Sequence, residues 1–149
     1  MPTRVSAADR RNDPFPAASG DHLATQVRDL MTPGVVTIAE DASLVHAYRA
    51  MVVHSVHAVL VIGRAEGRPL GWVTSRGLLS WVGYDQGLAC VREAVTERAT
   101  VIDPSATVRE ALRALSQPGT SHLLVCKTTQ SIPEGVVSEL DLVAFVGAS

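Results

Sequence analysis

The chain repeats itself at a spacing of 64 residues, and this repeat limits its possible folds more than any other feature. Residues 27–82 align with 91–146 without a gap, and several of the pairs that differ are apolar in both copies. Fifteen pairs are identical, among them Val27/Val91, Arg28/Arg92, Thr32/Thr96, Ile38/Ile102, Ala47/Ala111, Arg49/Arg113, Leu60/Leu124, Pro69/Pro133, Gly71/Gly135 and Leu78/Leu142. One such unit would have only a marginal core, so we expect two units that bury their sheets against each other.

Each copy shows the same order of local patterns, which predicts a β-α-β-β-α unit. Short β-branched runs at 34–38 and 99–102 predict strands, and apolar runs at 57–62 and 121–126 predict strands buried on both faces. Between them, helical spacing and a Thr107–Glu110 capping box predict amphipathic helices. The expected buried positions of these helices are Leu44, Ala47, Tyr48, Met51 and Val52 in the first copy and Val108, Ala111, Leu112 and Leu115 in the second.

The repeat also predicts the division of the chain. We expect a flexible, polar N-terminal tail at 1–20, a first unit at 21–83, a linker at 84–90 and a second unit at 91–149. Residues 21–31 are expected to form a short helix that leads into the first unit.

Composition excludes several classes of protein. Apolar residues make up 46% of the chain and aromatic residues 4%, so the core must be aliphatic. A net charge of −2 argues against binding to nucleic acid or to an anionic membrane. No apolar run approaches the roughly 18 residues of a membrane span, and the N-terminus lacks the apolar segment of a secretory signal. Two cysteines, Cys90 and Cys126, make no disulfide framework, so a cytoplasmic location is expected.

Catalysis and metal binding are not expected either. His54 and His57 could approach each other only on a helix, and a strand is expected to begin there. The remaining histidines, His22, His46 and His122, complete no metal site. Because no nucleophile, base and orienting group recur at suitable spacing, we expect no enzyme activity.

The two copies differ where the closing helix begins. The second copy reads "GVVSELDL" at 135–142 and the first reads "GWVTSRGL" at 71–78, so Ser138-x-x-Asp141 corresponds to Thr74-x-x-Gly77. Ser-x-x-acid is itself a capping pattern, and an acid in the first turn suits the helix dipole. The pattern therefore has a structural interpretation that needs no ligand.

Longer stretches of both copies resemble a known family. They are "VRDLMTPGVVTIAEDASLVHAYRAMVVHSVHAVLVI" with "PLGWVTSRGLL", and "VREAVTERATVIDPSATVREALRAL" with "SHLLVC" and "GVVSELDLV". Together they resemble a tandem pair of cystathionine-β-synthase-type (CBS) domains, the Bateman module, over 27–146. This implies the fold class α/β (α+β), with two β-α-β-β-α CBS units packed sheet to sheet in pseudo-twofold symmetry. Leu60 and Leu124 depart from the family, since many members have proline there.

The resemblance implies a ligand site between the units. The family pattern is Gly-x-x-Ser/Thr-x-x-Asp/Asn, whose hydroxyl and carboxylate typically hold a ribose. Because this acid faces the first two strands of the other unit in similar pairs, the expected ligand-binding residues are Ser138, Asp141, Val36, Thr37, Ile38, Val56, His57 and Ala58. Strand 36–38 would meet adenine, and His57 would donate to a phosphate unless it only bonds a backbone carbonyl.

The equivalent second site is expected to be degenerate. Its members would be Thr74, Gly77, Val101 and Ser121, and it lacks both the carboxylate and the histidine. Trp72 and Trp81 are expected beside this cleft, where core or dimer packing is the main interpretation and adenine stacking the alternative.

Two functions follow as hypotheses. The first is a non-catalytic sensor that binds AMP, ADP, ATP, S-adenosylmethionine or a similar compound, forms a disc-like homodimer and regulates an unknown partner protein. No cofactor is required in that case. The alternative is a ligand-free structural or protein-interaction module, in which Ser138 and Asp141 only cap a helix.

Overall fold

A computed structural model describes residues 22–85, 87–128 and 130–148 of the chain. The expected tail at 1–20 lies outside the described residues. The strands are β1 (Thr32–Pro33), β2 (Thr37–Ala39), β3 (Ala58–Ile62), β4 (Pro69–Thr74), β5 (Thr100–Ile102), β6 (His122–Val125) and β7 (Gly135–Ser138). The α-helices are α1 (Leu44–His54), α2 (Ser75–Leu79), α3 (Val108–Leu115) and α4 (Glu139–Gly147). Short 3-10 helices are η2 (His22–Ala24), η3 (Val27–Asp29) and η4 (Val91–Ala94).

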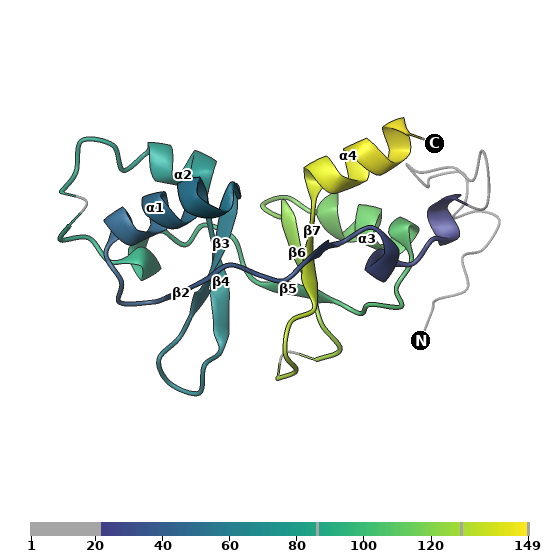
Figure 1. The fold of residues 1–149 in the computed structure, drawn as a ribbon, viewed down its shortest axis with the longest axis horizontal. Helices are drawn as coiled ribbons and strands as arrows, with labels where there is room; N and C mark the ends of the chain where they lie inside the picture. Colours follow the sequence, from purple (N-terminus) through teal and green to yellow (C-terminus); the bar gives the residue numbers. More distant parts are fainter. Residues whose placement is uncertain (1–21, 86, 129, 149) are drawn as a thin grey trace.

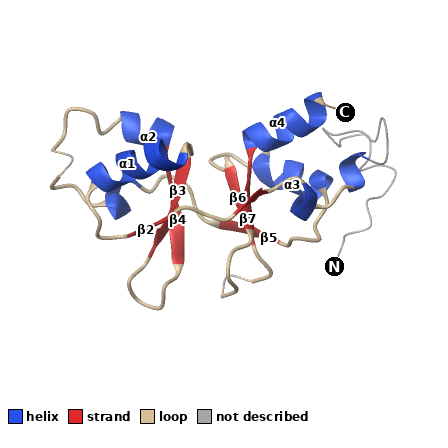
Figure 2. Ribbon diagram, in the orientation of Figure 1, coloured by secondary structure: helices blue, strands red, loops and turns tan. Residues whose placement is uncertain are grey.

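The described strands form two sheets that face each other across the middle of the molecule (Figures 1 and 2). The order is β2-β3-β4 in one sheet and β1-β7-β6-β5 in the other. We call β2–β4, α1 and α2 the first half and β5–β7, α3 and α4 the second half. Leu60 and Trp72 of the first half pack against Leu124 and Cys126 of the second. The predicted fold, two α+β units packed sheet to sheet, is therefore confirmed.

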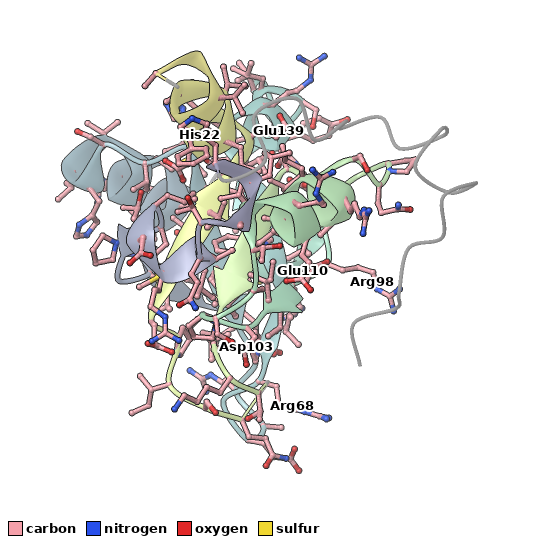
Figure 3. All side chains as sticks on the ribbon, turned by 90° about the vertical axis from the view of Figure 1, so that its right-hand side faces the viewer. His22, Arg68, Arg98, Asp103, Glu110 and Glu139 are labelled. Atoms are coloured by element: carbon pink, nitrogen blue, oxygen red, sulfur yellow. The ribbon has the colours of Figure 1, made fainter. Side chains whose placement is uncertain are left out.

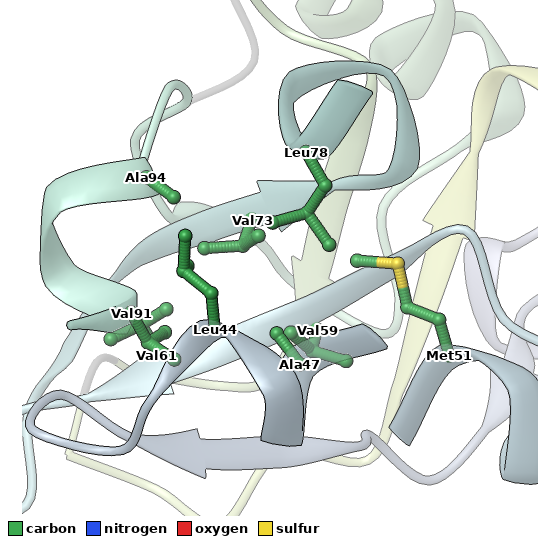
Figure 4. Packing of buried hydrophobic residues seen from close by; sticks show 9 residues of the cluster. All are labelled: Leu44, Ala47, Met51, Val59, Val61, Val73, Leu78, Val91 and Ala94. Atoms are coloured by element: carbon green, nitrogen blue, oxygen red, sulfur yellow. The ribbon is translucent and has the colours of Figure 1, made fainter. Parts of the chain in front are cut away.

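Helices cover the outer face of each sheet, and each half has its own aliphatic core. In the first half, Leu44, Ala47 and Met51 of α1 pack on the outer face of the sheet (Figure 4). In the second half, α3 begins with the expected capping box: the Thr107 N–H donates to Glu110 Oε2 over 2.7 Å, and the Glu110 N–H donates to Thr107 Oγ1 over 3.2 Å. Satisfied first-turn N–H groups fix where this helix starts.

Two local expectations were wrong. Val52, expected to be buried, is 79% exposed, because the α1 face that meets the sheet is already filled by Leu44, Ala47 and Met51. The short helix expected at 21–31 is replaced over its described part by η2 and η3, separated by Thr25 and Gln26.

Each sheet pairs with a segment that lies next to the other sheet in the sequence. β1 pairs with β7, so Thr32 lies opposite Val136 although the first half follows β1 directly. In the reverse direction, the segment after η4 bonds to β4: the Trp72 N–H donates to the Glu97 carbonyl over 2.8 Å. Val27 likewise belongs to the core of the second half, and Val91 to that of the first. The halves are therefore bound by backbone pairing as well as by the sheet interface.

Candidate functional site

A cavity of about 700 Å³ lies where the two halves meet. Seven of the eight residues expected at the ligand site line it: Ser138, Asp141, Val36, Thr37, Val56, His57 and Ala58. Ile38 is not among the lining residues. The cavity takes these residues from α1–β3, from the segment before β2 and from the start of α4, so both halves are needed to build it.

Ser138 and Asp141 hold each other at the start of α4. The Asp141 N–H donates to Ser138 Oγ over 3.2 Å, and the Ser138 N–H donates to Asp141 Oδ2 over 2.8 Å. Both residues are half-buried. This is the capping box that the sequence indicated, and it fixes the carboxylate in place beside the cavity. A carboxylate has roughly four acceptor positions, so the cap leaves capacity for further donors.

Another part of the lining is an unpaired strand edge. β2 is the outer strand of its sheet, and its only strand neighbour there is β3, with Thr37 opposite Leu60. An edge strand presents one row of backbone N–H and C=O groups that the sheet does not use. At Thr37 this edge lines the cavity, where the sequence predicted contact with a base, whereas the Val36 carbonyl already accepts from the Leu60 N–H of β3 over 2.9 Å.

Sequence reasoning missed three of the lining residues. Trp72 and His122 line it together with Val136, and the Trp72 and His122 rings lie 5.4 Å apart. Trp72 is 1% exposed, and its Nε1–H has no hydrogen-bond partner among the described residues. Burial lowers the pKa of His122, against the opposing effect of nearby Glu97, Glu139 and Asp141. From the sequence, Trp72 was expected beside the other cleft. The contact between Trp72 and His122 arises from packing between the two sheets, which local sequence patterns do not reveal.

Protein side chains fill the equivalent positions in the predicted second site. Glu97 stands where the first copy has Pro33, and its carboxylate accepts from the Ser121 N–H and the Ser121 hydroxyl, each over 2.6 Å. A Cβ atom on Gly77 would meet Thr74 Oγ1 at 3.2 Å and Thr96 at 3.4 Å. Ser121 thus has an internal carboxylate as its partner. Val101 lies apart from this group and lines a different cavity, of about 670 Å³, between the 66–70 and 130–133 loops.

Replacing Glu97 by alanine should lower the free energy of unfolding by about 1–3 kcal/mol, because the half-buried Ser121 N–H and hydroxyl would lose their acceptor. Urea denaturation measures this change. Glu134→Ala is the matched control, since Glu134 is exposed and its carboxylate makes no hydrogen bond with a described residue. Equal midpoints for the two variants would contradict the role given to Glu97.

Other features limit what the site can be. No group of three histidine, cysteine or acidic residues within the described ranges could hold a metal ion. The described helices also include none that combines the length and the apolar character needed to cross a membrane.

Comparison with known proteins identifies both halves. A family model described as CBS domain matches residues 27–84 and again 91–148. A CBS-domain containing protein from Agrobacterium tumefaciens shares 25% identity at a TM-score of 0.70, covering 86% of this chain and 96% of that one. A hexameric CBS-CP12 protein from bloom-forming cyanobacteria shares 25% at 0.71, covering 81% and 67%.

A further structure shows likeness of fold only. It is the CBS domain of a bacterial CNNM/CorC family Mg²⁺ transporter in complex with ATP, which shares 18% identity at a TM-score of 0.72 and covers 87% of this chain and 92% of that one. No protein with a curated description matches the chain significantly in sequence.

Proposed function

The chain belongs to the CBS domain family as a tandem pair, a regulatory module, and on this premise we propose that its central cavity binds an adenosine-containing ligand. Tandem CBS domains are in general non-catalytic. Binding would change the angle between the halves, and a partner protein would respond to that change. The cavity takes residues from both halves, so a bound ligand can favour one angle between the halves over another.

The observation that carries the proposal is the pairing of an acid with a strand edge across one cavity. Asp141 is an acceptor suited to the two adjacent hydroxyl donors of a ribose. The unpaired edge of β2 at Thr37 lines the same cavity and offers a backbone donor and a backbone acceptor to a purine edge. Apolar side chains, including Val56, Ala58 and Val136, line the same cavity, which suits a planar base.

The bacterial transporter domain that holds ATP has this fold, which supports the view that such a fold accommodates an adenine compound. Because its identity to this chain is low, that structure does not specify the ligand here. The ligand class therefore has to follow from the geometry of the cavity.

A thermal-shift panel tests the proposal. Adenosine, AMP, ADP, ATP and S-adenosylmethionine are each added in large excess over the full chain. A ligand at 100 times its Kd adds about 2.7 kcal/mol, which raises the Tm of a domain of this size by several degrees. If no adenosine compound raises the Tm, the sensor function is excluded.

One observation favours a second function, a ligand-free interaction module. Asp141 already accepts a hydrogen bond from the Ser138 N–H, so its place in the sequence has a structural use without any ligand. A negative thermal-shift panel combined with self-association would support this alternative.

We further propose that the chain forms a homodimer through the outer faces of α2 and α4. These helices lie on the same side of the molecule (Figure 1). Leu79 and its repeat equivalent Val143 are 69% and 66% exposed, and Val82 and its equivalent Val146 are 66% and 52% exposed. Leu79 ends α2 and Val82 follows it, whereas Val143 and Val146 lie on α4, so apolar side chains repeat at equivalent places and suit a symmetric contact with a second copy. The hexameric cyanobacterial protein supports the capacity of such domains to assemble.

Val143→Glu is expected to convert the dimer to a monomer, because a carboxylate would be buried in the contact without a partner. Sedimentation velocity measures the mass directly. Ile132→Glu introduces the same charge at a residue that is 88% exposed on a loop, and it should leave the dimer intact. A wild-type monomer would overturn the dimer proposal.

A further inference from the structure

The side chains around the central cavity carry an acid and no permanent cation. Asp141 lines the cavity, whereas no lysine or arginine is among its described lining residues. Gly34 lines the cavity, and its repeat equivalent is Arg98. Arg98 lies just before β5, is not among the lining residues and extends outward (Figure 3). A phosphate group placed here would therefore meet an acid without a guanidinium or ammonium partner.

The helix start beside the cavity does not supply the missing positive charge. The N-terminus of α4 would otherwise attract an anion through its dipole and free N–H groups. In this chain its first turn carries two acids, Glu139 and Asp141, and the Asp141 N–H is already bonded to Ser138 Oγ. The first turn of α4 thus opposes a phosphate.

The histidines of the cavity are weak substitutes for a cation. His54, His57 and His122 line it. Burial lowers the pKa of His122, so its ring stays uncharged at neutral pH although Glu97, Glu139 and Asp141 lie near it. His57 is exposed, so solvent would screen any charge on its ring. A neutral imidazole can still donate or accept a hydrogen bond.

Trp72, one of the lining residues, carries a neutral donor. Its ring is 1% exposed, and its Nε1–H has no acceptor among the described residues. A buried N–H without a partner is unfavourable and is rare in native proteins. The repeat equivalent in the second half is Val136, which also lines the cavity and has no such donor. The Nε1 atom is closed to solvent in this structure, so a ligand with an uncharged acceptor would satisfy it once the indole turns toward the cavity.

We propose that the cavity selects a nucleoside without phosphate groups, and that the Trp72 indole N–H donates a hydrogen bond to it as a specificity determinant. This inference rests on the proposed function and narrows its ligand class. It differs from the expectation that His57 donates to a phosphate, because Asp141, Glu139 and the absence of a lining arginine or lysine among the described residues outweigh one exposed imidazole.

Isothermal titration of the full chain at pH 7.5 with adenosine, AMP and ATP tests the charge selection. Adenosine should bind at least tenfold more tightly than either phosphorylated compound. If AMP or ATP binds more tightly than adenosine, this inference is overturned while the proposed function stands. If none of the three binds, and S-adenosylmethionine also fails, the proposed function itself is overturned.

A pair of tryptophan variants tests the donor. Trp72→Phe keeps an aromatic ring but removes the N–H, and it should weaken adenosine binding by roughly three- to tenfold. Trp81→Phe is the matched control, because Trp81 does not line the cavity and packs against Tyr84 at 5.4 Å between rings. Equal affinities for the two variants would overturn the role of Trp72.

The Trp81→Phe chain also provides a direct readout, since Trp72 is then its only tryptophan. Adenosine should change the emission of Trp72 with the Kd found by titration, because the ligand would contact the indole. This measurement uses a protein with an intact cavity, so it holds even if Trp72→Phe fails to fold. Unchanged Trp72 emission at saturating adenosine would overturn direct contact.

Discussion

Replacing Asp141 by asparagine is expected to weaken adenosine binding by roughly 10- to 100-fold. The asparagine keeps the size of the side chain and one oxygen that can accept from the Ser138 N–H, so the start of α4 remains capped. It loses the charge that strengthens hydrogen bonds from the two ribose hydroxyls. Titration calorimetry of both chains with adenosine gives the ratio of Kd values.

Glu110→Gln is the matched control for this substitution. Glu110 has the same part in the capping box of α3 that Asp141 has in α4. Glu110 lies on α3, whereas Asp141 and its first-turn neighbour Glu139 lie on α4 (Figure 3). Glu110 does not line the cavity. Both variants should lose a similar small amount of stability, while only the change at Asp141 should affect affinity. Equal affinities would show that Asp141 only caps the helix.

Gly71→Ala and Gly135→Ala should each lower the free energy of unfolding by about 2 kcal/mol or more. A Cβ atom on Gly135 would lie 2.5 Å from the Thr32 carbonyl oxygen and 2.8 Å from Met31 Sδ. On Gly71 it would be closer still to the Glu97 carbonyl oxygen and 2.7 Å from Val95 Cγ1. Because backbone has to move to relieve these contacts, the cost should reach the upper range for overpacking.

The control for the glycine pair is Gly147→Ala. A Cβ atom there meets nothing within 4 Å, and the residue lies in the last turn of α4. Alanine favours helix over glycine, so this change should be neutral or stabilising by up to about 1 kcal/mol. Chemical denaturation of the three variants compares them. If Gly71→Ala and Gly135→Ala are as stable as Gly147→Ala, the close approach of the neighbouring backbone to Gly71 and Gly135 is contradicted.

The sequence predicted the halves well because their order depends on local patterns that occur twice. Strands 57–62 and 121–126 are recognisable from continuous apolar runs, and Thr107 with Glu110 marks a helix start through contacts three residues apart. The exposed Val52 shows the limit of this reasoning. Helical spacing gives the direction of a side chain, but the width of the neighbouring sheet decides whether the chain is covered.

The candidate site was predictable where repeat positions could be compared and where the family resemblance applied. The repeat singled out Ser138 and Asp141, the resemblance implied the strand at 36–38, and the structure brings Ser138, Asp141, Val36 and Thr37 to one cavity. Trp72 was expected beside the other cleft, and His122 and Glu97 were given no ligand role, because their positions depend on contacts between the halves, such as the pairing of Trp72 with Glu97. Contacts of that kind join residues far apart in sequence and leave no periodic pattern to detect.

The exchange of β1 and the 95–97 segment between the halves has a consequence for how the chain folds. Residues 32–33 are made early by the ribosome, yet their strand partner β7 begins only at Gly135. During synthesis, the first half also has to wait for Val91 and Glu97 before its core and its last strand are complete. Such distant contacts give a high contact order, which slows folding. The two CBS domains are thus two units by ancestry and family but one unit in cooperative folding, and neither should be expected to fold on its own.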